Sequence, residues 1–163
     1  MSNILKEDEL IFRLEINKVI DELIDKINFG NKKASDIGEV KDGIIAGRIK
    51  DLLFTEKKIE NHYHKLYFGK DINRYHLRES SQYVNYNKDK MMQEELIRVG
   101  GKGPGLRMRN EKLFKREQII YRKVGKEIIA TISESGVYYE QTIHSYHIFD
   151  KSYKAKFILA LFN

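Results

Sequence analysis

Cationic side chains are concentrated in residues 100–126, which read GGKGPGLRMRNEKLFKREQIIYRKVGK. This basic stretch holds nine lysines and arginines against two glutamates, a net charge of +7, whereas the whole chain has a net charge of +6. The positive charge is therefore gathered where one polyanionic partner can be bound. Lysine and arginine neutralise phosphates and release their counterions, so the pattern predicts a nucleic-acid contact region.

Two arginines in this stretch, Arg107 and Arg109, alternate with Leu106 and Met108. In an extended segment, this spacing places both guanidinium groups on one face. A guanidinium can pair with guanine through two hydrogen bonds in the major groove, which is worth about 1–3 kcal/mol of discrimination. We therefore predict that Arg107 and Arg109 read bases. A solvated basic loop is the alternative interpretation.

Four other cations of the stretch are candidates for phosphate contact. Lys102 lies in the glycine-rich segment at the start, and Arg122, Lys123 and Lys126 lie near the tip of an expected hairpin. Long cationic side chains at a hairpin tip can follow a phosphate backbone. A solvated turn explains the same residues, and both interpretations stay open here.

Tyr139 and Gln141 lie on one face of an expected strand, Tyr138 lies on the opposite face, and His144 follows on the same strand. Glutamine can read adenine through two hydrogen bonds, and tyrosine can reach a phosphate or stack on a base. Tyrosine-rich strands are also typical of sheet packing. We therefore add Tyr139, Gln141 and His144 to the candidate DNA contacts, with packing inside the sheet as the alternative.

No arrangement of residues in the sequence is typical of catalysis or of a metal site. The pairs His62 with His64 and His144 with His147 lack the neighbouring carboxylate and histidine cluster of a zinc site. The absence of cysteine excludes disulfides, thiolate zinc sites and a cysteine nucleophile. We expect no catalytic, cofactor-binding or metal-binding residues in this chain.

Helical and extended patterns alternate around these candidates. Apolar residues at steps of three or four predict an amphipathic helix over residues 8–27, and further helices are expected at 89–99 and 152–163. The expected strands span residues 35–40, 64–69, 72–77, 82–87, 118–124, 127–133 and 137–149. Gly125 and Lys126 predict a tight hairpin between two of them. The class is α+β: an N-terminal amphipathic helix, then a mixed, largely antiparallel sheet with flanking helices.

Length and hydropathy place the chain among single-domain globular proteins. With 163 residues and 41% hydrophobic content, it can bury a core of its own. No apolar run approaches the roughly 20 residues that a membrane crossing needs, and the acidic start lacks the pattern of a signal peptide. We expect a cytoplasmic protein without a membrane partner.

Several segments in this order resemble a known family. They are residues 36–55 (DIGEVKDGIIAGRIKDLLFT), 65–77 (KLYFGKDINRYHL), 83–91 (YVNYNKDKM), 105–131 (GLRMRNEKLFKREQIIYRKVGKEIIAT), 138–150 (YYEQTIHSYHIFD) and 156–163 (KFILALFN). Together they look like the TaqI-like specificity domain, or target recognition domain. That domain follows the catalytic domain of adenine-specific DNA methyltransferases and of fused restriction–modification enzymes.

The resemblance implies a DNA target-recognition domain over residues 31–163, preceded by a connecting helix in residues 1–30. Such a domain closes over duplex DNA opposite the methyltransferase domain of the same polypeptide and reads the target bases. The parent enzyme would methylate adenine with S-adenosylmethionine, and would use Mg²⁺ if it also cleaves. Because the catalytic half lies outside this sequence and the family extends past residue 163, we interpret the chain as a fragment.

Two other classes of function remain as alternatives. The same basic surface suits an RNA-binding or protein-interaction module. A small metal-dependent nuclease is the other alternative, and the missing carboxylate constellation argues against it.

Overall fold

The computed structural model describes residues 18–100 and 105–163. The chain forms two compact units, residues 1–36 and 37–163. In the first unit, α1 (Lys18–Asn28) is amphipathic, and its apolar side chains, such as Val19 and Leu23, are exposed. The predicted N-terminal helix is thus confirmed over its described part. Residues 8–17 lie outside the described residues.

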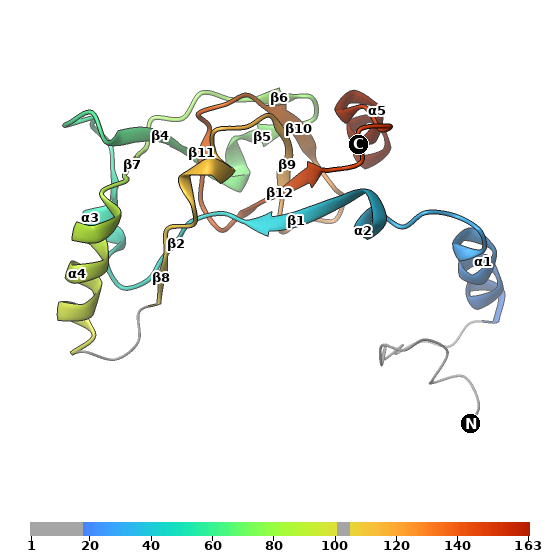
Figure 1. Ribbon diagram of the computed structural model, residues 1–163, viewed down its shortest axis with the longest axis horizontal. Coiled ribbons are helices and arrows are strands. Elements are labelled where there is room, and N and C mark those ends of the chain that lie inside the picture. The colour runs from blue at the N-terminus through green and yellow to red at the C-terminus, as the bar shows by residue number, and fades with distance from the viewer. Residues whose placement is uncertain (1–17, 101–104) are drawn as a thin grey trace. The chain divides into compact units, whose positions relative to one another are not determined.

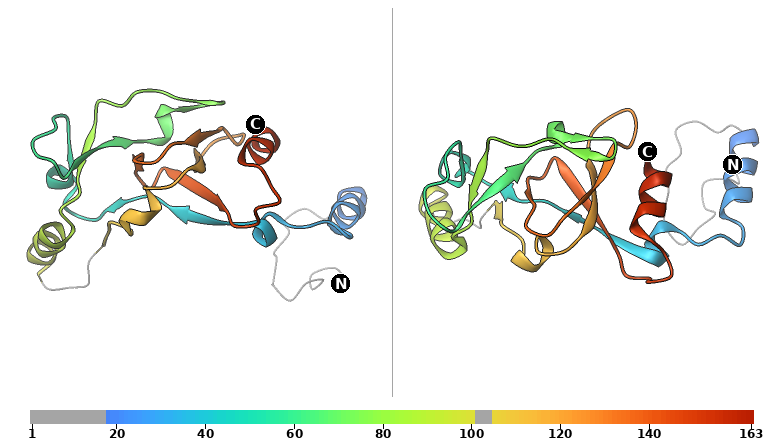
Figure 2. Two further views of the ribbon diagram at one scale, coloured as in Figure 1. Left: turned by 45° about the horizontal axis from the view of Figure 1, so that its top comes forward. Right: turned by 90° about the horizontal axis from the view of Figure 1, so that it is seen from above.

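The second unit contains an antiparallel four-stranded sheet with the order β1-β12-β9-β10 (Figure 1). Its strands are β1 (Gly38–Asp42), β12 (Ile143–Ile148), β9 (Gln118–Arg122) and β10 (Ala130–Ser133). The C-terminal helix α5 (Ala155–Phe162) packs against β10 and β9 (Figure 2). It buries Ile158 and Leu159 in a small hydrophobic cluster with Ile119, Ala130 and Tyr146.

A second four-stranded sheet has the order β11-β4-β7-β3, in which only β11 and β4 are parallel. Its strands are β11 (Tyr138–Tyr139), β4 (Tyr63–Tyr67), β7 (Tyr83–Asn85) and β3 (Phe54–Thr55). Two short pairs complete the strands, β2 (Ile45–Ala46) with β8 (Leu106–Arg107) and β5 (Ile72–Asn73) with β6 (His76–Leu77). The other helices are α2 (Ala34–Ile37), α3 (Lys50–Leu53), α4 (Lys88–Arg98) and the 3₁₀ helices η1 (Gly69–Asp71) and η2 (Glu111–Leu113). The predicted α+β class is confirmed.

Aromatic rings form the centre of the larger hydrophobic cluster. The ring of Tyr138 stacks on His64 at 4.3 Å and on Phe114 at 4.6 Å, measured between ring centroids. The Tyr86 ring meets Tyr138 edge-on at 5.1 Å. Large buried rings of this kind contribute strongly to a core and also constrain its geometry. The segments that carry these residues are therefore held at fixed distances from one another.

Two predicted strands differ from the structure in their extent, since β1 begins only at Gly38 and the strand 137–149 is interrupted. Residues 35–40 begin with the helical turn α2, because the Asp36 carboxylate accepts a hydrogen bond from the Lys33 N–H at 2.8 Å and stabilises a local turn. The expected strand 137–149 is divided into β11 and β12. A turn separates them, in which the Glu140 carboxylate accepts the Thr142 N–H at 2.8 Å. Three consecutive polar residues, Glu140, Gln141 and Thr142, interrupt the apolar alternation at this turn, so the sequence does carry a signal for it.

One predicted strand and the predicted hairpin differ from the structure in their turns. The run 72–77 is a short β5–β6 hairpin rather than one strand. β10 begins at Ala130, so residues 123–129 form a longer loop in place of the predicted tight turn at Gly125 and Lys126. The Arg122 N–H donates to the Ile129 oxygen at 3.1 Å and closes this loop.

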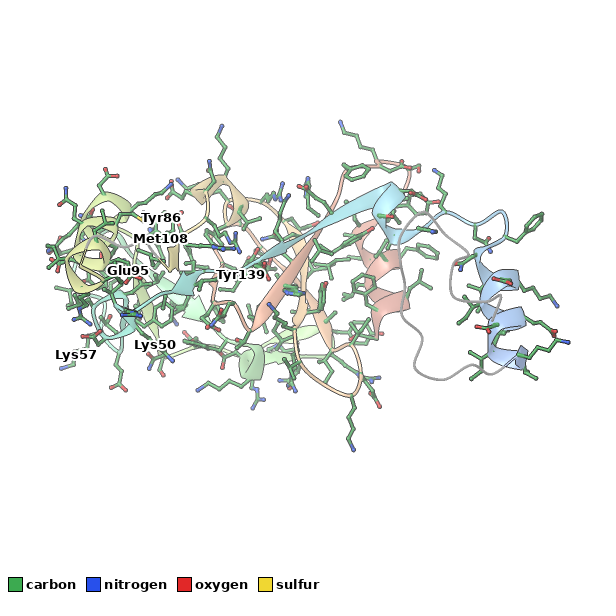
Figure 3. The ribbon with its side chains drawn as sticks, turned by 90° about the horizontal axis from the view of Figure 1, so that it is seen from below. Lys50, Lys57, Tyr86, Glu95, Met108 and Tyr139 are labelled. Carbon is green, nitrogen blue, oxygen red and sulfur yellow. The ribbon has the colours of Figure 1, made fainter. Side chains whose placement is uncertain are left out.

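Helix α4 buries a carboxylate beside an apolar side chain. Its extent agrees with the predicted helix 89–99 to within one residue, but its buried side chains are Met91 and Glu95, and Leu96 is exposed. The Glu95 carboxylate accepts the Arg48 N–H at 2.9 Å and the Gly105 N–H at 3.1 Å. Figure 3 labels Glu95 at the same end of the unit as Met108 and Tyr86. Glu95 therefore ties two loops to α4.

We predict that Glu95→Ala lowers the free energy of unfolding by about 1.5–3 kcal/mol, because two backbone donors lose a charged acceptor. Urea denaturation would measure the loss, and amide hydrogen exchange at Arg48 and Gly105 should become faster. Glu95→Gln keeps one acceptor oxygen and should cost less. The same change at the more exposed Glu94 is the matched control, and an equal effect of Glu94→Ala would contradict the assigned role of Glu95.

Candidate nucleic-acid interface

The start of the basic stretch is a well-anchored edge rather than a free loop. β8 pairs with β2, so that Arg107 lies opposite Ile45. The Tyr86 hydroxyl donates to the backbone oxygens of Met108 at 3.2 Å and Arg109 at 3.1 Å, and Tyr86 and Met108 lie together in Figure 3. Leu106 and Met108 are buried, while Arg107 is exposed. The predicted alternation is confirmed over these three residues. Lys102 lies outside the described residues.

Arg109 leaves the face on which Arg107 lies. Its φ of 62° is in the left-handed region, which interrupts the extended segment. Its Nε donates to the Gly43 oxygen at 3.0 Å, and its Nη2 lies 3.3 Å from the Asp42 carboxylate. The prediction that Arg107 and Arg109 share one face of an extended segment is therefore wrong. Arg109 is directed toward the end of β1.

Asp42 gathers three of the predicted DNA-contact residues. Besides Arg109, Lys123 Nζ lies 3.2 Å and His144 Nε2 lies 2.9 Å from Oδ1 of Asp42. His144 faces Asp42 across β1 and β12, whereas Lys123 comes from the loop after β9. We call Asp42, Arg109, Lys123 and His144 the Asp42 cluster. It joins residues that lie up to about a hundred positions apart in the sequence.

The cationic side chains of the Asp42 cluster lower the pKa of the Asp42 carboxylate. Partial burial favours a higher pKa for Asp42, but the hydrogen bond from Lys123 and the charges of Lys123, His144 and Arg109 outweigh it, so the pKa lies below its ordinary value. The carboxylate thus stays ionised and holds the three side chains near one another. Two of them, Arg109 and Lys123, are cations against one carboxylate, so the cluster retains attraction for an anion.

Arg122 does not serve as a free phosphate contact in this structure. Its Nε and Nη2 both donate to the Ile72 oxygen, at 2.9 and 2.5 Å. The guanidinium thereby ties β9 to β5, which is a structural role. Lys126 is exposed in the loop of residues 123–129, where its ammonium can reach an approaching polyanion.

Tyr139 cannot contact DNA in this structure, because its side chain is fully buried. Its hydroxyl accepts a hydrogen bond from Gln118 Nε2 at 3.2 Å, and burial raises its pKa to about 12. Tyr138 is buried as well, so the two tyrosines do not divide between a core face and a DNA face. Gln141 is exposed on the turn between β11 and β12, and its backbone N–H donates to the Ile44 oxygen at 2.9 Å.

Sequence reasoning missed the acidic residues of β1 that organise the cations. Glu39 lies 2.7 Å from Lys41 Nζ and 3.9 Å from Arg116 Nη2. Asp42 holds the other side chains of the Asp42 cluster. No sequence signal connects β1 to the basic stretch, because these contacts depend on strand pairing. The sequence does carry a signal for Arg116, because this residue lies within the basic stretch.

An open hollow of about 1000 Å³ adjoins the loop of residues 123–129. Its lining combines aromatic and cationic side chains, with the rings of Phe54 and Phe68 edge-to-face at 5.9 Å and Lys70 Nζ 5.8 Å from the Phe68 ring. Arg48 and Lys50 also line it. Rings and cations side by side suit the sugars, bases and phosphates of nucleic acid. Among the described residues, no group of three histidines or carboxylates is placed to hold a metal ion.

Comparison with known proteins gives one family. The family model for the TaqI-like C-terminal specificity domain matches residues 64–163. The match includes Arg107, Lys123, Gln141 and His144, and it leaves out β1 and Asp42. No curated protein matches the sequence. Within residues 18–100 and 105–163, no helix has the length and apolar character for crossing a membrane.

The Asp42 cluster predicts a pH dependence of stability. The pKa of Asp42 is lower in the folded chain than its ordinary value of 3.8. Its ionised form therefore stabilises the fold fully above the ordinary pKa, and this contribution disappears as the pH falls through the folded value. We expect the free energy of unfolding of Asp42→Asn to fall less steeply than that of the wild type between about pH 5 and about pH 2.

Urea denaturation over a pH series measures this difference. Asp89→Asn removes one carboxylate from an exposed position of α4, outside the cluster, and is the control. Equal pH slopes for the wild type and Asp42→Asn would contradict the ion pairs of the Asp42 cluster.

Proposed function

We propose, since this chain belongs to the family of TaqI-like C-terminal specificity domains, that its exposed cationic surface reads a specific sequence of duplex DNA. Domains of this family recognise the DNA target in restriction–modification systems. In this proposal residues 31–163 are the recognition domain, and residues 1–30 form the connecting segment. The partners are duplex DNA and the catalytic domain of the parent enzyme.

One observation carries the proposal. Arg107 and Gln141, which are exposed, are fixed on either side of the same short segment, since Arg107 pairs with Ile45 and Gln141 bonds to Ile44. Arginine and glutamine are the side chains that pair with guanine and adenine edges through two hydrogen bonds. Rigid backbones on both sides reduce the conformational entropy that is lost on binding. We therefore assign base reading to Arg107 and Gln141.

Lys123, Lys126, Arg109 and His144 are assigned to the phosphate backbone. Contacts to phosphates set the orientation of a protein on the duplex and supply affinity that falls with salt. Lys123 and Arg109 are held by Asp42 in the absence of DNA. An arriving phosphate replaces part of the interaction with Asp42, so these cations are already near their contact positions.

We assign the chemistry of the parent enzyme to its catalytic domain. We propose that the parent transfers a methyl group from S-adenosylmethionine to adenine, and that any cleavage uses Mg²⁺. The hollow of about 1000 Å³ does not fit that cofactor. S-adenosylmethionine carries a sulfonium cation, whereas Arg48, Lys50 and Lys70 line the hollow. Asp51, the carboxylate among its described lining residues, is already paired with Arg98 at 2.7 Å. In this proposal the chain binds and orients DNA.

Substitutions in the two classes of residue should have different effects. Arg107→Ala and Gln141→Ala should each reduce the preference for the bound sequence by about 1–3 kcal/mol, because each removes a base contact. Lys126→Ala should weaken binding to all duplexes alike and reduce the slope of log affinity against log salt by about 0.9. Fluorescence anisotropy with duplexes selected from a random pool, over a salt series, measures both quantities.

Lys57→Ala is a matched control for Lys126→Ala, because both lysines are exposed and Lys57 lies outside the proposed surface. Equal affinity of the wild-type chain for every duplex would refute base reading. Tighter binding to single-stranded RNA than to duplex DNA would favour the RNA-binding alternative instead.

A further inference from the structure

A second, smaller hollow lies beside the Asp42 cluster, and most of its lining residues are cationic. It has a volume of about 260 Å³ and is lined by Lys41, Arg109, Asn110, Lys112, Leu113 and Arg116. Four of these six residues carry positive charge, and none is acidic. We call this feature the basic hollow. Its residues come from β1 and from the segment around η2, so only the folded chain assembles it.

Carboxylates outside the lining hold three of the four cations in place. Glu39 pairs with Lys41 at 2.7 Å and approaches Arg116 at 3.9 Å, while Asp42 pairs with Arg109 at 3.3 Å. Lys112 is exposed at the rim. The exposed pairs of Glu39 add little stability. Their effect is to keep cations together that would otherwise repel one another, so that four positive charges share one concave surface.

Arg116 adds an observation that is independent of charge. Its Nε–H is buried, and it has no hydrogen-bond acceptor among the described residues. A buried donor without an acceptor is rare in proteins and costs free energy. A bound oxyanion that accepts hydrogen bonds from a guanidinium would satisfy the donor and the charge together.

We propose that the basic hollow seats one backbone phosphate of the bound duplex, an inference that rests on the proposed recognition of DNA. Its volume lies below the range of about 300–1,000 Å³ that is typical of pockets for drug-sized ligands. The hollow therefore suits one phosphate group better than a whole nucleotide. Arg116 and Lys112 contact this phosphate, and Arg109 links the hollow to the Asp42 cluster. The seated phosphate sets the register in which Arg107 and Gln141 meet the bases.

Two variants of the chain test the hollow, Arg116→Gln and Lys112→Gln. Each should reduce the slope of log affinity against log salt by about 0.9, which makes the loss of affinity between 50 and 200 mM salt about 3.5-fold smaller than in the wild type. Lys115→Gln is the matched control, because Lys115 lies near Lys112 but pairs with Glu111 at 2.9 Å and does not line the hollow. Lys112 is exposed, so its variant should fold normally even if Arg116→Gln does not.

A neutral methylphosphonate placed at one phosphate at a time, along a duplex selected by the wild-type chain, locates the contact. We expect one position at which the substitution weakens wild-type binding but has no effect on binding by Arg116→Gln or Lys112→Gln. Such coupling between one phosphate and one side chain indicates direct contact. Lys115→Gln should remain as sensitive to that position as the wild type.

The other outcomes test the basic hollow and the proposed function independently. If both variants keep the full salt slope and the full methylphosphonate pattern, while Arg107→Ala loses sequence preference, the hollow is refuted and DNA recognition stands. If the chain shows no preference among duplexes, the proposed function fails, and the hollow as a DNA subsite fails with it. If inorganic phosphate binds at the hollow and duplex DNA does not compete with it, the ligand is a free phosphate and the proposal is overturned.

Discussion

The segment from Asp42 to Ala46 is hydrogen-bonded on both of its sides, and the candidate interface depends on this double pairing. On one side Ile44 bonds to Tyr139 and Gln141, and on the other β2 pairs with β8. The approach is so close that a Cβ atom on Gly43 would lie 2.4 Å from the backbone oxygen of Glu140, so this position requires glycine. Buried Glu95 adds a second anchor for the 105–109 segment. Three segments far apart in the sequence thereby meet within one small region.

Acidic residues give this basic surface its order. Glu39 and Asp42 on β1 each contact two or more cationic or titratable side chains, so flexible lysines and arginines are held close to defined positions. Unpaired cations would be spread apart by mutual repulsion and would lose more freedom on meeting DNA. The carboxylates reduce the net positive charge of the surface, and they fix the positions of the cations that carry the remaining charge. A surface of this kind favours recognition at one register over general adhesion to polyanions.

The division of roles follows from how each side chain is supported. Arg107 and Gln141 extend from backbones fixed by hydrogen bonds and are exposed, as base-reading side chains must be. Arg122 and Tyr139 are also residue types that can contact DNA, but Arg122 is bonded to the Ile72 oxygen and Tyr139 is packed in the aromatic core. Residue type therefore defines what a side chain can bind, and its neighbours in the fold decide whether it is available.

By itself the sequence determined the α+β class, the described part of the N-terminal helix, helices α4 and α5, and the concentration of cations in residues 100–126. These features arise from local periodicity and composition, which can be read from short stretches of the sequence. Only the tertiary structure decided that Tyr139 is buried, that Arg109 turns to Asp42, and that Lys41 and Arg116 share one hollow. Those outcomes depend on β1 pairing with β12 and on a turn at residues 140–142. Contacts between residues up to a hundred positions apart leave no periodic trace in the chain.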